Sequence, residues 1–167
     1  MDVRFINPFI ASSRDVFDKM VHEPLALGKP FVRPPGVHPN YTVSALIGLA
    51  GAVTGCVVLG FSQQVATALA SGISGTPIAQ LDADCVDALG EIVNMIAGAA
   101  KKDLPGGLTT MSTPSVIIGS HNIKYPSSTP ILVIPCETKA GAFAIEVAIS
   151  QAPKAEVSVP AAATTAA

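Results

Sequence analysis

Glu91 and Asn94 are the residues whose types and spacing most suggest chemistry in this sequence of 167 residues. They lie three positions apart in the segment DALGEIVNMIAGAAKK, residues 87–102. On a helix, this spacing makes two side chains neighbours on one face. A carboxylate accepts hydrogen bonds and pairs with cations, while a carboxamide both donates and accepts and can therefore orient a water molecule. Because Asn does not titrate, Asn94 is suited to positioning a water rather than to acting as a general base.

The segment around this pair has the period of an amphipathic helix. Its polar side also carries Gly98, which has no side chain and would let another backbone approach closely. A solvated surface helix would show the same polar pattern, so the spacing alone does not separate a functional face from an ordinary one. The predicted apolar side holds Leu89, Ile92, Val93, Ile96 and Ala100, and the predicted polar side holds Asp84, Asp87, Glu91, Asn94, Gly98, Lys101 and Lys102, with a half-exposed Met95 beside them.

Other catalytic patterns are missing from the sequence. No Ser, His and Asp arrangement is evident, and the three histidines lie in loop-like stretches without metal-ligand spacing. The three cysteines lie in apolar runs without a CxxC motif, which indicates buried reduced thiols in a cytoplasmic protein. We therefore expect neither a metal site nor a disulfide framework.

Composition narrows the class of protein further. Apolar residues make up 49% and charged residues 13%, which argues against a disordered chain. The formal net charge is −2 and no basic cluster occurs, so nucleic acid is not an expected partner. Val43 to Phe61 is uncharged and long enough to span a bilayer as a helix. Its four glycines and many β-branched residues favour two strands joined by a turn near residues 50–54 instead, so we expect no membrane segment.

The chain should form one domain over residues 1–151, followed by a disordered Ala/Thr/Pro-rich tail over 152–167. Strand and helix runs are segregated, which predicts an α+β fold with a mainly antiparallel sheet and helices on one face, in the rough order α-ββ-α-α-ββββ. The expected elements are a helix from Asn7 to about Val21 with Asn7 as its cap, an irregular connector over 22–40, a hairpin over 41–61, a helix capped by Ser62, a helix from Asp82 or Asp84 to about Lys102, and strands over 108–112, 115–121, 130–138 and 141–150.

The segment around Glu91 and Asn94 is similar to the signature of a known protein family. The segment EIVNMIAGAAK resembles the signature of the CheC/CheX/FliY chemotaxis phosphatases, in which Glu-x-x-Asn precedes a small residue and a glycine on an exposed helix. The resemblance extends from about residue 4 to residue 150, through FINPFIASSRDVFDKM, VSALIGLAGAVTGCVVLGFS and STPSVIIGSH. It implies a CheC-like fold. Because the first helix lacks a second Glu-x-x-Asn, the arrangement is similar to that of the CheX members.

The resemblance implies a phosphatase that hydrolyses the phospho-aspartate of a CheY-like response regulator. Asn94 would position the attacking water, and Glu91 would dock the receiver by pairing with its lysine. Asp87, Met95, Gly98 and Lys101 would line the contact. The chain itself would bind no cofactor or metal, since Mg²⁺ is expected on the receiver, and a homodimer is implied. The alternative is a non-catalytic module of the same fold that binds a receiver or a flagellar-switch component.

Overall fold

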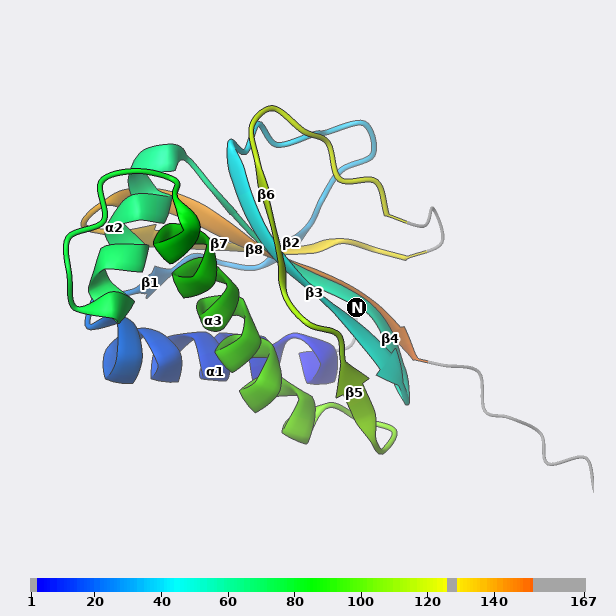
Figure 1. The fold of residues 1–167 in the computed structure, drawn as a ribbon. Helices are drawn as coiled ribbons and strands as arrows, with labels where there is room; N and C mark the ends of the chain where they lie inside the picture. Colours follow the sequence, from blue (N-terminus) through cyan, green and yellow to red (C-terminus); the bar gives the residue numbers. More distant parts are fainter. Residues whose placement is uncertain (1–2, 126–128, 152–167) are drawn as a thin grey trace, which may run out of the picture.

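An antiparallel sheet of eight strands forms the base of the structure (Figure 1). The computed structural model describes residues 3–125 and 129–151, and the predicted tail over 152–167 lies outside them. The main strand order is β1-β7-β8-β4-β3-β5, with β2 also pairing with β7 and β6 with β3. The strands are β1 (Ala26–Leu27), β2 (Phe31–Val32), β3 (Val43–Gly51), β4 (Val53–Phe61), β5 (Thr109–Met111), β6 (Ser115–Ile118), β7 (Leu132–Thr138) and β8 (Gly141–Gln151).

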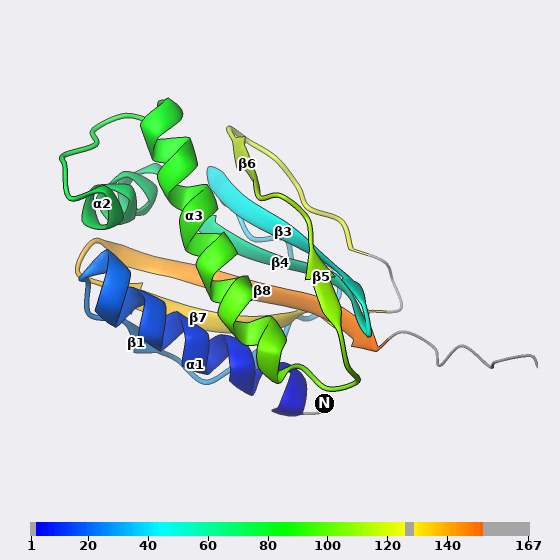
Figure 2. The same cartoon turned by 60° about the horizontal axis from the view of Figure 1, so that its bottom comes forward.

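The helices pack on one face of this sheet (Figure 2). They are α1 (Asn7–Val16), which continues as a π-helical turn η2 (Phe17–Val21), α2 (Gln63–Ser74) and α3 (Ala83–Ala100). Short 3-10 turns, η1 (Val3–Phe5) and η3 (Lys101–Asp103), precede α1 and follow α3. The helices on one side and the antiparallel pairing throughout confirm the predicted α+β fold.

The uncharged stretch from Val43 to Phe61 forms the predicted hairpin. Strands β3 and β4 pair in register from Val43 opposite Phe61 to Leu49 opposite Gly55. Among residues 3–125 and 129–151, no helix is both long enough and apolar enough to cross a membrane.

Two sequence predictions at the N-terminal side were wrong. Ile6, not Asn7, occupies the cap position of α1, and no side chain accepts a hydrogen bond there. The connector over 22–40 is not wholly irregular, because it contributes β1 and β2 to the outer edge of β7. The backbone N–H groups of Gly28 and Arg33 donate to the carbonyls of Pro135 (2.8 Å) and Ile131 (2.9 Å). A strand of two residues is too short to show an alternation of apolar and polar residues, so the sequence pattern could not predict β1 and β2. They are strands because they pair with the free edge of β7.

The main core lies between the sheet and the helices. Phe143 of β8 stacks on Phe17 with ring centroids 5.5 Å apart, and Phe61 lies 5.3 Å from the same ring. All three rings are buried. Because these rings come from η2, β4 and β8, they tie the first helical segment to the centre of the sheet.

The other face of the sheet is closed around a buried carboxylate. Glu146 of β8 is 1% exposed, and its Oε1 accepts from Arg33 at 2.8 Å and from the Tyr41 hydroxyl at 3.0 Å. Its Oε2 accepts from the Tyr125 hydroxyl at 2.7 Å. Burial, with the negative charge of Glu146 next in size, raises the pKa of both tyrosines, which keeps them protonated as donors. The cluster therefore holds the segments around residues 33–41 and 119–125 against the sheet.

Replacing Arg33 by Met should lower the free energy of unfolding by about 3–5 kcal/mol, because it leaves the buried carboxylate without its cation. Urea denaturation would measure this loss. The matched control is Lys19→Met, since Lys19 pairs with Asp15 at 3.2 Å on the surface, where the two side chains are 65% and 70% exposed. That control should change stability by less than about 1 kcal/mol. Equal effects of the two substitutions would contradict the central role of the buried cluster.

Candidate functional site

Helix α3 is positioned by a cap at its start and by an apolar stripe along its length. The Asp82 side chain accepts a hydrogen bond from the backbone N–H of Cys85 at 3.0 Å. Of the two predicted starts of this helix, Asp82 and Asp84, Asp82 is therefore the cap. All five residues of the predicted apolar face are buried: Leu89, Ile92, Val93, Ile96 and Ala100. The helix packs against α1, α2 and β3 through this side, so its rotation about its own axis is set by burial.

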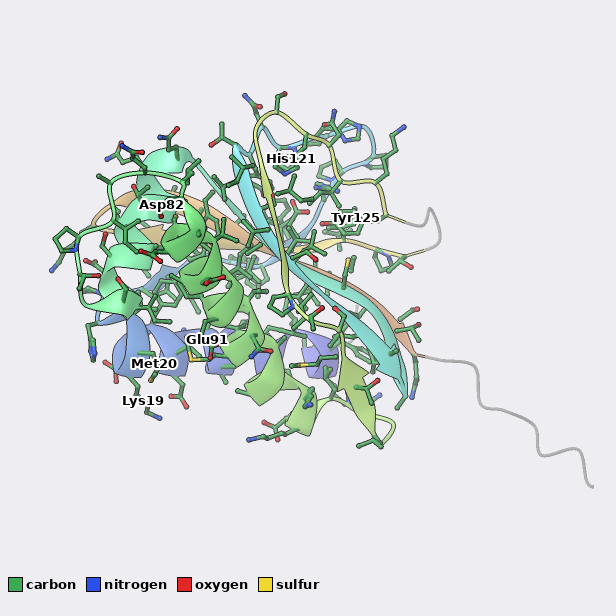
Figure 3. The ribbon with its side chains drawn as sticks, viewed as in Figure 1. Lys19, Met20, Asp82, Glu91, His121 and Tyr125 are labelled. Atoms are coloured by element: carbon green, nitrogen blue, oxygen red, sulfur yellow. The ribbon has the colours of Figure 1, made fainter. Side chains whose placement is uncertain are left out.

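This rotation presents the Glu91 and Asn94 pair to the outside. Glu91 is exposed and Asn94 is half-buried. Within residues 3–125 and 129–151, neither side chain has a hydrogen-bond or ion-pair partner. Figure 3 shows Asp82 and Glu91 along α3 on the helical side of the sheet. Among the described residues, no partner occupies the donor and acceptor groups of Glu91 and Asn94, so these groups can meet a water molecule or another protein.

The other predicted contact residues follow the same side of α3. Asp87 is exposed, while Gly98 is half-buried. Met95 is half-buried and packs against the edge of the core. Lys101 lies just after the helix, in η3, and is half-buried. The structure thus brings all six predicted site residues onto one helix and its C-terminal turn.

Glu91 lies between two shallow hollows that sequence reasoning missed. One lies between α3 and the C-terminal end of α2 and includes Ile73, Ile78 and Ala88. The other lies between α3 and β6 and includes Pro114 and Val116. Apart from Ala88, which belongs to α3, these side chains come from segments that meet α3 only in the folded chain, so no local pattern could have found the hollows.

Gly98 is not required by the packing of this chain. Among the residues that the structure describes, an added Cβ would meet only the Cε of Met111, at 3.7 Å, which is an ordinary contact. The residue also lies in a helix interior, where Gly is less favourable than Ala by about 1 kcal/mol. Gly72 of α2 differs, because a Cβ there would lie 2.6 Å from the carbonyl oxygen of Val21. Glycine at position 98 therefore lowers helix stability without relieving a clash.

Neither Cys85 nor His121 is poised for catalysis in the described part of the chain. Burial, followed by the charge of Asp82, raises the pKa of the Cys85 thiol, so this sulfur stays protonated. His121 lies across the sheet, where its ring nitrogens are 2.7 Å from the carbonyl oxygen of Gly119 and 2.8 Å from the Ser44 hydroxyl (Figure 3). In the described part of the chain, no three His, Cys, Asp or Glu side chains gather closely enough to hold a metal ion. The geometry suits water positioning and ion pairing.

Known proteins are similar to this chain in sequence and in fold. Residues 43–137, more than half of the chain and including all of α3, match the family described as chemotaxis phosphatase CheX. The chain belongs to the CheX family. The CheY-P phosphatase CheX of Thermotoga maritima is 28% identical over 137 residues, which covers 81% of this chain and 88% of that protein.

Solved structures of CheX proteins have the same architecture. The chemotaxis protein CheX from Desulfovibrio desulfuricans superposes with a TM-score of 0.79 at 30% identity, covering 89% of this chain and 99% of the other. A CheX–CheY–BeF₃–Mg²⁺ complex from Borrelia burgdorferi matches with a TM-score of 0.74 at 24% identity, covering 88% of this chain and 98% of that chain. At that identity, the second likeness concerns the fold alone.

Replacing Gly98 by Ala should raise the free energy of unfolding by about 0.5–1 kcal/mol, because Ala favours the helix and meets no clash. Chemical denaturation of the purified protein would measure the gain. Gly72→Ala is the matched control within a second helix, and it should destabilise because its Cβ would overlap a backbone oxygen. Destabilisation by Gly98→Ala would mean that the fold itself needs this glycine.

Proposed function

We propose that this CheX-family chain hydrolyses the phospho-aspartate of a CheY-like response regulator. The proposal is supported by the family and by a relative that is named a CheY-P phosphatase. The observation that carries it is the pair Glu91 and Asn94 on the outward side of α3, beside a glycine that the fold does not need. Neither side chain of the pair has a hydrogen-bond or ion-pair partner among the described residues.

The reaction asks little covalent chemistry of the phosphatase. An acyl phosphate is already reactive, and the receiver's own Mg²⁺ neutralises the charge on the phosphoryl group. The water oxygen forms a bond to phosphorus while the bond from phosphorus to the aspartate oxygen breaks. The aspartate leaves as a carboxylate, and the water's protons leave with the phosphate. Positioning of this water is the main contribution required of the phosphatase.

Asn94 supplies that positioning in our proposal. Its carbonyl oxygen accepts from the attacking water while its amide group contacts the phosphoryl oxygens, which aligns the water with the bond that breaks. Glu91 pairs with a lysine of the receiver and fixes the docking. Asp87, Met95 and Lys101 line the contact, and Gly98 lets the receiver's backbone approach. This chain contributes no metal ligand to the reaction.

The assembly that carries out this reaction is, in our proposal, a homodimer, as the resemblance to CheX members implies. Both members of the Glu91 and Asn94 pair lie on a single α3 helix. Each subunit would therefore hold its own copy of the pair. Sedimentation equilibrium of the purified chain would measure the oligomeric state, and a monomer at working concentrations would contradict the dimer.

Asn94→Ala should reduce stimulated dephosphorylation by at least about 10²-fold, because the water loses its orienting group. Decay of the phosphorylated receiver, with and without the chain, would measure this loss. Asn122→Ala, an exposed substitution outside α3, is the matched control and should retain the parent's rate. Full activity of Asn94→Ala would refute the water-positioning role. If the parent bound the receiver without shortening its lifetime, the chain would be the non-catalytic module instead.

Glu91→Gln should weaken binding of the phosphorylated receiver by about 10-fold or more, because it removes the charge but retains the shape of the side chain. Titration calorimetry with a receiver carrying a stable phosphoryl mimic would measure the affinity. The control is Glu137→Gln on β7, which is also exposed but lies on a different element. Unchanged affinity of Glu91→Gln would contradict the ion pair with the receiver.

A further inference from the structure

The hollow between α2 and α3 adjoins Glu91, yet water positioning and the lysine pair leave it unused. It lies where the C-terminal end of α2 and the following loop face the N-terminal half of α3. Its lining residues are Ile73, Ser74, Thr76, Ile78, Asp84, Asp87, Ala88 and Glu91.

The floor of this hollow is apolar and only partly covered. Ile73, Ile78 and Ala88 are half-buried and pack against the edge of the core. Each therefore keeps apolar surface that a partner side chain would remove from water, at a gain that grows with the area covered.

The loop that borders the hollow is held in place by its own hydrogen bonds. The Ser71 hydroxyl donates to the carbonyl of Thr67 at 2.7 Å and accepts from the backbone N–H of Ile78 at 2.8 Å. Gly75 ends α2 in the left-handed region, with φ of 69°, and its N–H donates to the carbonyl of Ser71 at 3.0 Å. These bonds fix the shape of the hollow before any partner arrives, which reduces the ordering cost of binding.

All charged residues that line the hollow are acidic. Asp84, Asp87 and Glu91 are exposed, and none has an ion-pair partner within the described residues. The sequence contains no Lys or Arg between Arg33 and Lys101. Asp84 lies in the first turn of α3, where the helix dipole favours a carboxylate. Asp87 and Glu91 lie beyond that turn, so the dipole does not account for them.

The turn at the opposite end of α3 has a net positive charge, because it holds two lysines and Asp103. Lys101 and Lys102 follow the helix, about 15 Å from Glu91 at 1.5 Å per residue. A partner that lies along α3 therefore meets negative charge at the α2 end and positive charge at the other. Complementary charges on the partner would favour one docking direction over the reverse.

We infer that the α2–α3 hollow is a second contact for the phosphorylated receiver and receives an apolar side chain flanked by Lys or Arg. The inference rests on the proposed function, because the receiver that Glu91 and Asn94 engage must also cover the adjoining surface. Continuity with the Glu91 site selects the receiver as the occupant, and the acidic side chains of the hollow select a Lys or Arg beside its apolar side chain. The contact sets affinity and docking direction and leaves the water-positioning step to Asn94.

Asp84→Lys tests the charged side of the hollow, because Asp84 is exposed, lines the hollow and has no part in the proposed water-positioning site. Glu137→Lys is a control that makes the same charge change on β7. Dephosphorylation rates measured against receiver concentration should give a KM about tenfold higher for Asp84→Lys, with kcat within about twofold of the parent. The difference in KM should shrink at high salt, because exposed charges are screened. The control should retain the parent's KM. Equal KM values for the two variants would overturn the inference.

Ala88→Gln tests the apolar floor without changing charge, and Gln is a good helix former, so α3 should persist. It should raise KM by about threefold or more at every salt concentration, unlike Asp84→Lys. A parent-like KM would refute the apolar contact.

The two proposals fail in distinguishable ways. If the parent does not accelerate dephosphorylation, the proposed function fails. The hollow is then judged by the affinity of the same variants for a receiver loaded with beryllofluoride, where parent-like binding by Asp84→Lys and Ala88→Gln would overturn it. If the parent turns over but these variants match it, the hollow contact alone is refuted.

Discussion

Burial of one side of α3 is the constraint on which the candidate site depends. Each residue turns the helix by roughly 100°, so a rotation of one position would expose part of the Leu89, Ile92 and Ile96 stripe and move Glu91 towards the core. An ionised carboxylate without a partner is costly to bury, and the apolar side chains lose favourable contacts when exposed. The same burial that stabilises the helix therefore directs Glu91 and Asn94 outwards.

The two faces of the sheet are closed by different interactions. Aromatic and aliphatic side chains fill the space under the helices, with Phe143 between Phe17 and Phe61. The other face is closed around the Glu146 carboxylate, which has one guanidinium and two phenol groups within hydrogen-bond distance. Because burying such a charge requires partners in defined directions, this cluster specifies where the covering segments lie. The outward side of α3 is left uncovered by those segments (Figure 2).

An uncovered helix face is well matched to the chemistry of the CheX family. The bond to be hydrolysed is reactive, and its metal belongs to the receiver in the proposed reaction, so a rigid helix with a carboxamide and a carboxylate is enough to position a water and a partner. Gly98 is consistent with a docking role for this face. It lowers the helix propensity of α3, although the packing of the described residues would accept a side chain at that position. Surface that the fold does not need and leaves unpaired is where a binding partner should be sought.

The sequence by itself determined the features that depend on local patterns. The amphipathic period of α3, the β3–β4 hairpin and the Glu91 and Asn94 spacing all follow from neighbours a few residues apart, and the structure agrees with each. The sequence left the start of α3 open between Asp82 and Asp84, and the structure has Asp82 as the cap. Only the tertiary structure decided the strands β1 and β2, the hollows beside Glu91 and the buried cluster. Arg33 and Glu146 are separated by 113 positions, and β2 exists because β7 offers a free edge. Such contacts depend on which distant segments the folded chain brings together, and no short stretch of sequence encodes that choice.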